Sequence, residues 1–228
     1  PLVNEERPVA VESQEPTSSA EETTVVEIVN GTIESAEAQP EQAEDSVRLY
    51  GPVTHMEDGR LSIDSQAGNG YEGEVILNVS QESTYVLDAT SGMPVELSDM
   101  KDGDTIYAYI GPAMTMSLPP MTNATMIFAN VPADFKVPDY VTVKSVVTDA
   151  ASSQSVLTAE DGTKYTLADD CRIVPYLTRN IVFLDDLTPG KAVLVWKTTE
   201  GLKEVGPGVA EARASKVVLF QEQYSTGE

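Results

Sequence analysis

Apolar and polar residues alternate over short runs from Val47 onward, and each run stops at a turn rich in Gly, Pro or Asp. Alternation with a period of two indicates half-buried β-strands. Asp58-Gly59 between two such runs predicts a hairpin, because Gly takes the positive φ that a tight turn needs. The runs predict six strands in the first half of the chain, at residues 49–56, 60–64, 74–79, 84–88, 105–110 and 125–130, with a helical turn at 95–100.

The second half of the chain repeats this order. Residues 97–110 align with residues 184–197 at an offset of 87, and residues 124–131 align with residues 214–221. A period of this length suits a duplicated small domain rather than a solenoid unit. Short strands with a turn of helix before the penultimate one are typical of a small closed barrel. The sequence therefore predicts an all-β chain of two tandem small OB-like β-barrels that arose by internal duplication.

Composition sets the expected boundaries. Residues 1–45 hold twelve acids, one base and no aromatic residue, so they bury too little apolar surface to offset the entropy of ordering. We expect residues 1–46 to form an acidic, mostly disordered tether. The first barrel is predicted at residues 47–131 and the second at residues 140–224, with the Pro-containing stretch 132–139 as the linker.

The formal net charge of −23 excludes some classes of partner. Nucleic-acid binding needs a basic footprint, and an anionic membrane surface is disfavoured for the same reason. The chain starts at Pro1 without an initiator Met and has no apolar run that would span a bilayer, so we expect a removed targeting segment and no membrane insertion. The single Cys171 excludes an internal disulfide framework and a Cys-based zinc site.

Few residues are suited to catalysis. His55 is the only histidine, and no Gly-x-Ser-x-Gly elbow accompanies it. Its place before the Asp58-Gly59 turn predicts a surface hairpin residue, so we expect no enzyme and no cofactor. The densest acidic group matches no complete calcium loop, and weak calcium binding or Asp-Gly turns both explain it. That group consists of Asp99, Asp102 and Asp104.

The segment 111–124 has the most unusual composition. Its prolines, Pro112, Pro119 and Pro120, exclude a helix and predict an ordered excursion between the last two strands of the first repeat. Thioether sulfurs are soft ligands that favour Cu(I), and Met-x-Met spacing in an extended stretch points two sulfurs the same way. Methionines also fill irregular gaps over a barrel. The residues open to these two interpretations are Met114, Met116 and Met121.

Aromatic residues on the preceding strand suggest a further contact surface. Tyr107 and Tyr109 share one face of the strand at 105–110, and they align with Leu194 and Trp196 in the second repeat. Because the opposite face is also apolar, the tyrosine face meets either a ligand or the other barrel. Tyr and Trp are typical of interfaces, so we favour contact between the barrels.

Two runs in this region resemble a known family. They are Leu97-Ser-Asp-Met-Lys-Asp-Gly-Asp104 and Ala108-Tyr-Ile-Gly-Pro-Ala-Met-Thr-Met-Ser-Leu-Pro-Pro-Met-Thr-Asn-Ala124. Together they resemble an uncharacterised family of secreted clostridial-type proteins, often found with copper-amine-oxidase N-terminal-like domains. The resemblance covers residues 48–131 and implies export from a Gram-positive bacterium and a non-catalytic β-module. The family pattern often has Arg at the place of Met116, which weakens the copper interpretation.

These patterns predict a non-enzymatic extracellular or cell-surface binding or structural module. Its expected partner is an unknown protein or glycan at the cell surface, and the alternative function is Cu(I) binding by the Met-rich loop. The residues expected to contact the ligand are Tyr107, Tyr109, Pro112, Met114, Met116, Pro119, Pro120 and Met121.

Overall fold

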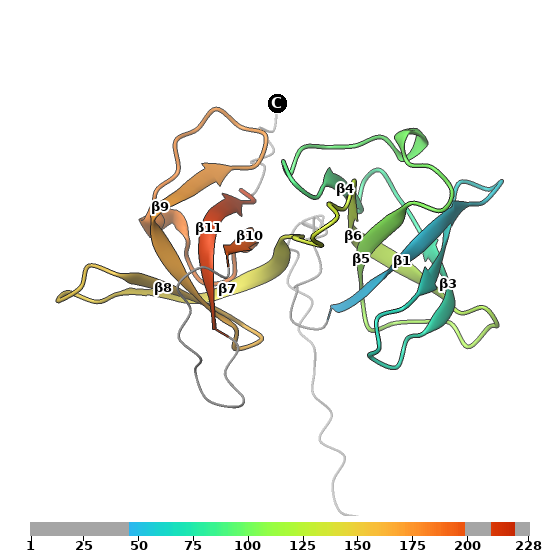
Figure 1. The fold of residues 1–228 in the computed structure, drawn as a ribbon, viewed down its shortest axis with the longest axis horizontal. Coiled ribbons are helices and arrows are strands. Elements are labelled where there is room, and N and C mark those ends of the chain that lie inside the picture. The colour runs from blue at the N-terminus through green and yellow to red at the C-terminus, as the bar shows by residue number, and fades with distance from the viewer. Residues whose placement is uncertain (1–45, 199–210, 222–228) are drawn as a thin grey trace, which may run out of the picture. The chain divides into compact units, whose positions relative to one another are not determined.

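The computed structural model describes residues 46–198 and 211–221. The predicted tether, apart from Ser46, lies outside the described residues, as does most of the second-repeat loop that corresponds to residues 111–124. The described chain is all-β and forms two closed five-stranded barrels, which confirms the predicted fold class (Figure 1). No helix among the described residues is long and apolar enough to cross a membrane.

The first barrel contains six strands and one turn of 3-10 helix. Five strands close in the order β1-β2-β3-β6-β5-β1, with β3 and β6 parallel and the other neighbours antiparallel. This is the strand order of an OB-like Greek-key barrel. The elements are β1 (Val47–His55), β2 (Leu61–Ser65), β3 (Gly73–Asn78), β4 (Tyr85–Asp88), η2 (Leu97–Asp99), β5 (Thr105–Ile110) and β6 (Met121–Ala129).

The second barrel repeats this order. It closes as β7-β8-β9-β11-β10-β7, and β9 and β11 are its parallel pair. The elements are β7 (Asp139–Thr148), β8 (Ser155–Ala159), β9 (Lys164–Pro175), η3 (Leu184–Asp186), β10 (Ala192–Thr198) and β11 (Glu211–Leu219).

Three details match between the barrels. The 3-10 turns η2 and η3 both stand just before the penultimate strand. A bulge falls between Tyr109 and Ile110 in the first barrel and between Trp196 and Lys197, at the same offset of 87, in the second. The long strand β9 corresponds to both β3 and β4 of the first barrel. Its last part pairs in parallel with β11, as β4 pairs with β6. These matches support the predicted duplication.

Each barrel encloses its own apolar core. Leu61, Ile63 and Ile106 are fully buried in the first, and Val143, Leu157 and Val193 in the second. The predicted hairpin forms between β1 and β2, where Gly59 has a φ of 84°.

The start of β6 differs from the prediction. The strand begins at Met121 rather than Thr125, because residues 121–123 pair with Ile76–Asn78 and close the barrel. The excursion between β5 and β6 therefore spans residues 111–120. Likewise, Asp139 belongs to β7, where it pairs with Val195.

Candidate functional site

A third apolar cluster lies between the barrels. Tyr109 and Phe128 of the first barrel pack against Tyr140, Leu194 and Phe220 of the second. The rings of Tyr109 and Tyr140 meet edge to face with centroids 5.8 Å apart, and the Tyr140 amide donates to the Tyr109 hydroxyl at 3.2 Å. Tyr109 is only 6 % exposed. The structure thus places this tyrosine in contact between the barrels, the interpretation that the sequence favoured over a ligand surface.

Trp196 strengthens this contact. Its Nε1 donates to the carbonyl of Ala89 at 3.0 Å, across the two barrels. A Cβ on Gly92, at φ 75°, would lie 2.8 Å from the indole ring, so only glycine lets the ring approach. The ammonium of Lys216 lies 4.4 Å from the centroid of the indole ring and donates to the Ser91 carbonyl.

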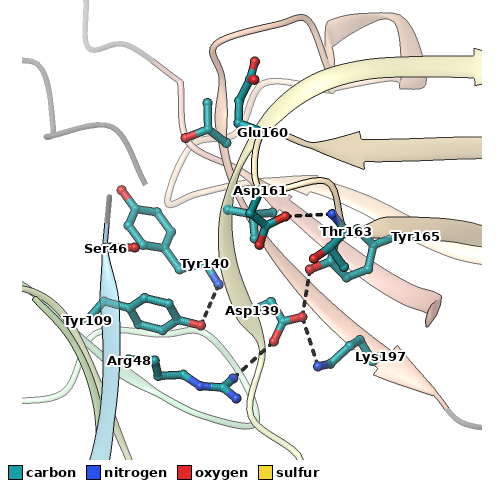
Figure 2. A pocket seen from close by; sticks show the side chains of 12 residues that line it. Ser46, Arg48, Tyr109, Asp139, Tyr140, Glu160, Asp161, Thr163, Tyr165 and Lys197 are labelled. Carbon is teal, nitrogen blue, oxygen red and sulfur yellow. Dashed lines mark hydrogen bonds and ion pairs between the residues drawn. The ribbon is translucent and has the colours of Figure 1, made fainter. Parts of the chain in front are cut away.

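Asp139 is the polar centre of the junction. Its Oδ1 lies 3.3 Å from Nη1 of Arg48 in β1, and its Oδ2 lies 3.0 Å from Nζ of Lys197 in β10. The same Oδ2 accepts a hydrogen bond of 2.8 Å from the Tyr165 hydroxyl. Figure 2 shows Arg48 and Tyr109 on one side of this carboxylate and Tyr165 and Lys197 on the other. One carboxylate therefore joins side chains of both barrels.

The ionisation of these groups follows from their surroundings. Burial and then the adjacent Asp139 carboxylate raise the pKa of Tyr165 above its usual range. Burial also raises the pKa of Tyr109. Burial by itself would lower the pKa of the Arg48 guanidinium, but Tyr109 and Asp139 outweigh it and raise that pKa. Both phenols are therefore protonated at neutral pH, and Tyr165 acts as a donor to Asp139.

A cleft opens around this centre in two adjoining compartments. We call the larger the hydroxyl basin; it has a volume of about 340 Å³, and six of the residues that line it carry hydroxyl groups. We call the smaller the cationic recess; it has a volume of about 180 Å³. Arg48 and Lys197 line both compartments, so the two lie next to each other. The six hydroxyl-bearing residues of the basin are Ser46, Tyr109, Tyr140, Thr142, Thr163 and Tyr165, of which Tyr109, Tyr140, Thr142 and Tyr165 are buried.

The cationic recess has an unusual lining for so acidic a chain. Of the described residues that line it, three are cationic, three are aromatic and none is acidic. The cations are Arg48, Lys136 and Lys197, and the aromatic residues are Tyr107, Phe135 and Trp196. The Arg48 guanidinium lies 5.3 Å from the centroid of the Tyr107 ring, which in turn stacks on Tyr50. Stacking of this kind holds the guanidinium in place while its edge remains a hydrogen-bond donor.

Phe135 is strained and exposed. It has a φ of 55°, and its amide closes a turn by donating to Pro132 at 2.9 Å. A bulky residue in the left-handed region costs about 1–2 kcal/mol relative to glycine. Nevertheless, the ring is 56 % exposed and lines the recess. Glycine at this position would make the protein more stable. Because the strained ring also lines the recess, its place points to a role in contact.

The loop at residues 111–120 is stabilised by hydrogen bonds within the loop and to the first residue of β6. Thr115 exchanges hydrogen bonds with Met121, since its amide donates to the Met121 carbonyl and its hydroxyl accepts from the Met121 amide. Ser117 bonds to the Thr115 hydroxyl and to the Pro119 carbonyl. Met116 and Leu118 project from this frame, fully exposed.

The other predicted contact residues of this loop are more dispersed. Pro112 is exposed, whereas Pro119 and Pro120 are half-buried. Met114 packs against the first-barrel core, and Sδ of Met121 accepts from the Arg60 guanidinium at 3.0 Å. A guanidinium beside the sulfur opposes a cation there. Copper(I) binding at Met114, Met116 and Met121 stays a prediction, and these placements do not favour it.

His55 has a carboxylate partner that the sequence did not identify. Its Nδ1 lies 2.8 Å from Oδ1 of Asp102, and its Nε2 lies 2.9 Å from the Leu97 carbonyl. These hydrogen bonds, first that with Asp102, raise the pKa of His55. Because both ring nitrogens face acceptors, the imidazolium ties the end of β1 to η2, and neither nitrogen faces a nucleophile.

The remaining candidates occupy structural positions. Asp102 bonds to His55, and Asp104 accepts from the Lys101 amide at 2.9 Å, so these acids close turns. Burial, followed by Asp170, raises the pKa of the Cys171 thiol to about 11, which keeps the thiol protonated. Among the described residues, no group of three or more His, Cys, Asp or Glu is arranged to hold a metal ion.

Sequence reasoning indicated the aromatic contact between the barrels but did not identify the charged residues of the junction. Asp139 was assigned to the linker, and Arg48, Lys136 and Lys197 were isolated bases in three separate segments. The composition held one signal for these residues. The chain has only 14 Lys and Arg against 37 Asp and Glu, so each base has many acidic residues with which it can form an ion pair. Comparison with protein-family models, curated proteins and solved structures found no match for this chain.

Proposed function

We propose that this chain is a non-enzymatic binding module, extracellular or at the cell surface, that takes an anionic ligand at the junction of its two barrels. The observation that carries this proposal is the strained, exposed Phe135 ring beside the cations Arg48, Lys136 and Lys197. Backbone strain concentrates at functional sites, where contact with a ligand offsets its cost. The extracellular location rests on the sequence resemblance.

The cations retain donors for a ligand. Arg48 directs one Nη toward Asp139, and a guanidinium has five N–H donors in all. Lys136 pairs only loosely with Asp134, at 3.6 Å, and its side chain is 66 % exposed. Charge-assisted hydrogen bonds from such groups are the strong ones in carboxylate recognition. A carboxylate in the recess would therefore meet preformed donors.

The non-enzymatic part of the proposal is supported by two placements. Both ring nitrogens of His55, the chain's one histidine, face hydrogen-bond acceptors, so neither is placed to act as a general base. The raised pKa of Cys171 leaves little thiolate, which is the nucleophilic form.

Trp196 provides the test, because it is the only tryptophan in the chain and lines the recess. Titration with phenylacetate should change its fluorescence with about millimolar affinity, whereas the neutral analogue phenylacetamide should not. Lys136→Gln should weaken the response, and Lys144→Gln, an exposed lysine of β7 that does not line the cleft, should leave it unchanged. Equal responses to the acid and the amide, or no response to either, would refute the proposal.

A further inference from the structure

The two compartments of the cleft differ in charge. Arg48 and Lys197 line both compartments. The cationic recess adds Lys136 and no acid, whereas the hydroxyl basin adds Glu160, Asp161 and the paired Asp139. A ligand that spans both therefore meets positive charge at one end and negative charge at the other. A polymer with a negative charge on every unit would be repelled by the basin. The cleft instead suits one anionic unit followed by a neutral one.

The hydroxyl basin suits a neutral unit rich in hydroxyls. Carboxylates only accept hydrogen bonds, whereas Ser, Thr and Tyr hydroxyls donate and accept. Asp161 is held in place because its Oδ1 accepts from the Thr163 amide at 2.8 Å. Sugar hydroxyls also donate and accept, so they match the exposed Asp161 carboxylate beside the half-buried Glu160 and Thr163. In Figure 2, Glu160, Asp161 and Thr163 lie on the second-barrel side of the basin.

The cationic recess suits an acidic sugar. Pyranose rings expose C–H groups on their faces, and these pack on exposed aromatic rings. Phe135 offers such a ring, and Arg48, Lys136 and Lys197 line the same recess as donors for a carboxylate. A ring and a carboxylate on one sugar would use both features together.

A peptide fits the cleft less well. Extended peptides often bind by adding a strand to an open sheet edge. Here the five-stranded sheets close on themselves. The cleft is lined mainly by residues of β1, β5, β7 and β10, of the β8–β9 turn and of the connection before β7. An acidic peptide is therefore the alternative that the experiment must distinguish.

We infer that the junction cleft binds a glycan in which a carboxylate-bearing sugar adjoins a neutral sugar, with the acidic sugar in the cationic recess and the neutral one in the hydroxyl basin. This inference rests on the proposed function, since it names the class of the anionic ligand. The carboxylate belongs either to a uronic acid or to a lactyl ether, and both sources share the chemistry that the recess recognises.

The experiment is a calorimetric titration of the full chain with five probes. A hyaluronan tetrasaccharide represents alternating uronate and neutral sugars, and the disaccharide of N-acetylglucosamine and N-acetylmuramic acid represents the lactyl source. The controls are a neutral chitotetraose, an oligogalacturonate with a charge on every unit, and a tetrapeptide with alternating glutamate and phenylalanine. We expect at least one alternating glycan to bind ten times more tightly than any control.

Variants locate the binding. Phe135→Gly removes the ring and relieves the strain, so it should weaken glycan binding about tenfold. Leu177→Gly is the matched control, because Leu177 is also 56 % exposed with a positive φ of 48° but does not line the cleft. Lys136→Gln should weaken binding about fivefold. Each variant is checked for an unchanged fold by circular dichroism.

The outcomes separate this inference from the proposed function. If the tetrapeptide binds as tightly as the alternating glycans, the glycan assignment is wrong and the anion-binding function stands. If the oligogalacturonate does, the assignment of a neutral sugar to the basin is wrong and the anion-binding function again stands. If no probe binds but phenylacetate still perturbs Trp196, the glycan assignment again fails alone. If phenylacetate fails as well, both are wrong. Glycan binding that Phe135→Gly and Lys136→Gln leave unchanged would place the site elsewhere and overturn the inference.

Discussion

The two barrels share strand order and a bulge at equivalent positions, yet they differ at two positions that the strand register makes equivalent. By strand register, Leu49 and Ile110 of the first barrel correspond to Asp139 and Lys197 of the second. The first two are fully buried apolar residues, whereas the second two form an ion pair of 3.0 Å. An apolar pair in one copy corresponds to a charged pair in the other. The difference shows that the same strand topology accepts either an apolar core pair or an ion pair at these positions.

A second difference lies in β1. Gly51 and Val141 occupy equivalent positions, because they pair with Ile106 and Val193. In the first barrel the Asp64 carbonyl approaches so closely that a Cβ on Gly51 would lie 1.9 Å from its oxygen. The same position thus accepts valine in one barrel and only glycine in the other, since the backbone of β2 comes closer.

Substitution of Gly51 should have the largest effect on the free energy of unfolding. Gly51→Val gives the first barrel the residue of the second, and it should lower the free energy of unfolding by about 3 kcal/mol or more, because backbone must move. Urea denaturation measures this change. Val141→Gly, the reverse substitution, should cost less, since it only removes a side chain. A wild-type midpoint for Gly51→Val would show that the close approach does not exist in solution.

Asp139→Ala should have the next largest effect. The substitution leaves Arg48 and Lys197 without their shared carboxylate and the Tyr165 hydroxyl without its acceptor, at a cost of about 3 kcal/mol in the free energy of unfolding. The double variant Asp139→Leu/Lys197→Ile restores the apolar pair of the first barrel. It should recover part of the loss, because apolar replacement of an ion pair is often neutral. Equal stability of the wild type and Asp139→Ala would contradict the role of this carboxylate.

Phe135→Gly should act in the opposite direction. Relief of the left-handed φ should raise the free energy of unfolding by about 0.5–1 kcal/mol, after allowance for the greater freedom of glycine in the unfolded chain. Leu177→Gly should show a similar gain at a site remote from the recess. Chemical denaturation of both variants checks the pair. A loss of stability in Phe135→Gly alone would mean that the ring serves packing rather than contact.

The smallest effect concerns pH. The pKa of His55 is raised above its ordinary value of 6.5, so its stabilising contribution is present below about pH 6.5 and is lost as pH rises through the folded-state value. The pKa of Asp102 is lowered, so its contribution is lost in acid as pH falls through its folded-state value. Thermal melts of wild type and His55→Gln from pH 5 to 9 should converge at alkaline pH, and parallel curves would refute this assignment.

Much of the fold could be predicted from the sequence because the pattern was strong. Alternating runs gave the six first-barrel strands, and the offset of 87 gave the second barrel. The start of β6 could not be placed, because its first residues pair with distant β3 only when the barrel closes. Strand pairing between remote segments leaves little local signal in the chain.

The site was less predictable than the fold. Tyr107 and Tyr109 were identified from their shared face, but the sequence did not predict that they differ in environment. Tyr109 is buried between the barrels, whereas the ring of Tyr107 lies against the Arg48 guanidinium in the recess. The cations come from β1, β10 and the connection before β7, and nothing in the sequence brings them together. Phe135 carries a positive φ that composition does not reveal.

The central claim is that the cationic recess holds an anion, and the indole N–H resonance of Trp196 tests it most directly. This chain has one tryptophan, so its signal in a ¹H–¹⁵N spectrum is unambiguous. We predict that phenylacetate shifts this resonance in a saturable manner, that added salt weakens the effect, and that Phe135→Gly/Lys136→Gln abolishes it. A resonance that does not move, or that moves equally with phenylacetamide, would contradict the account.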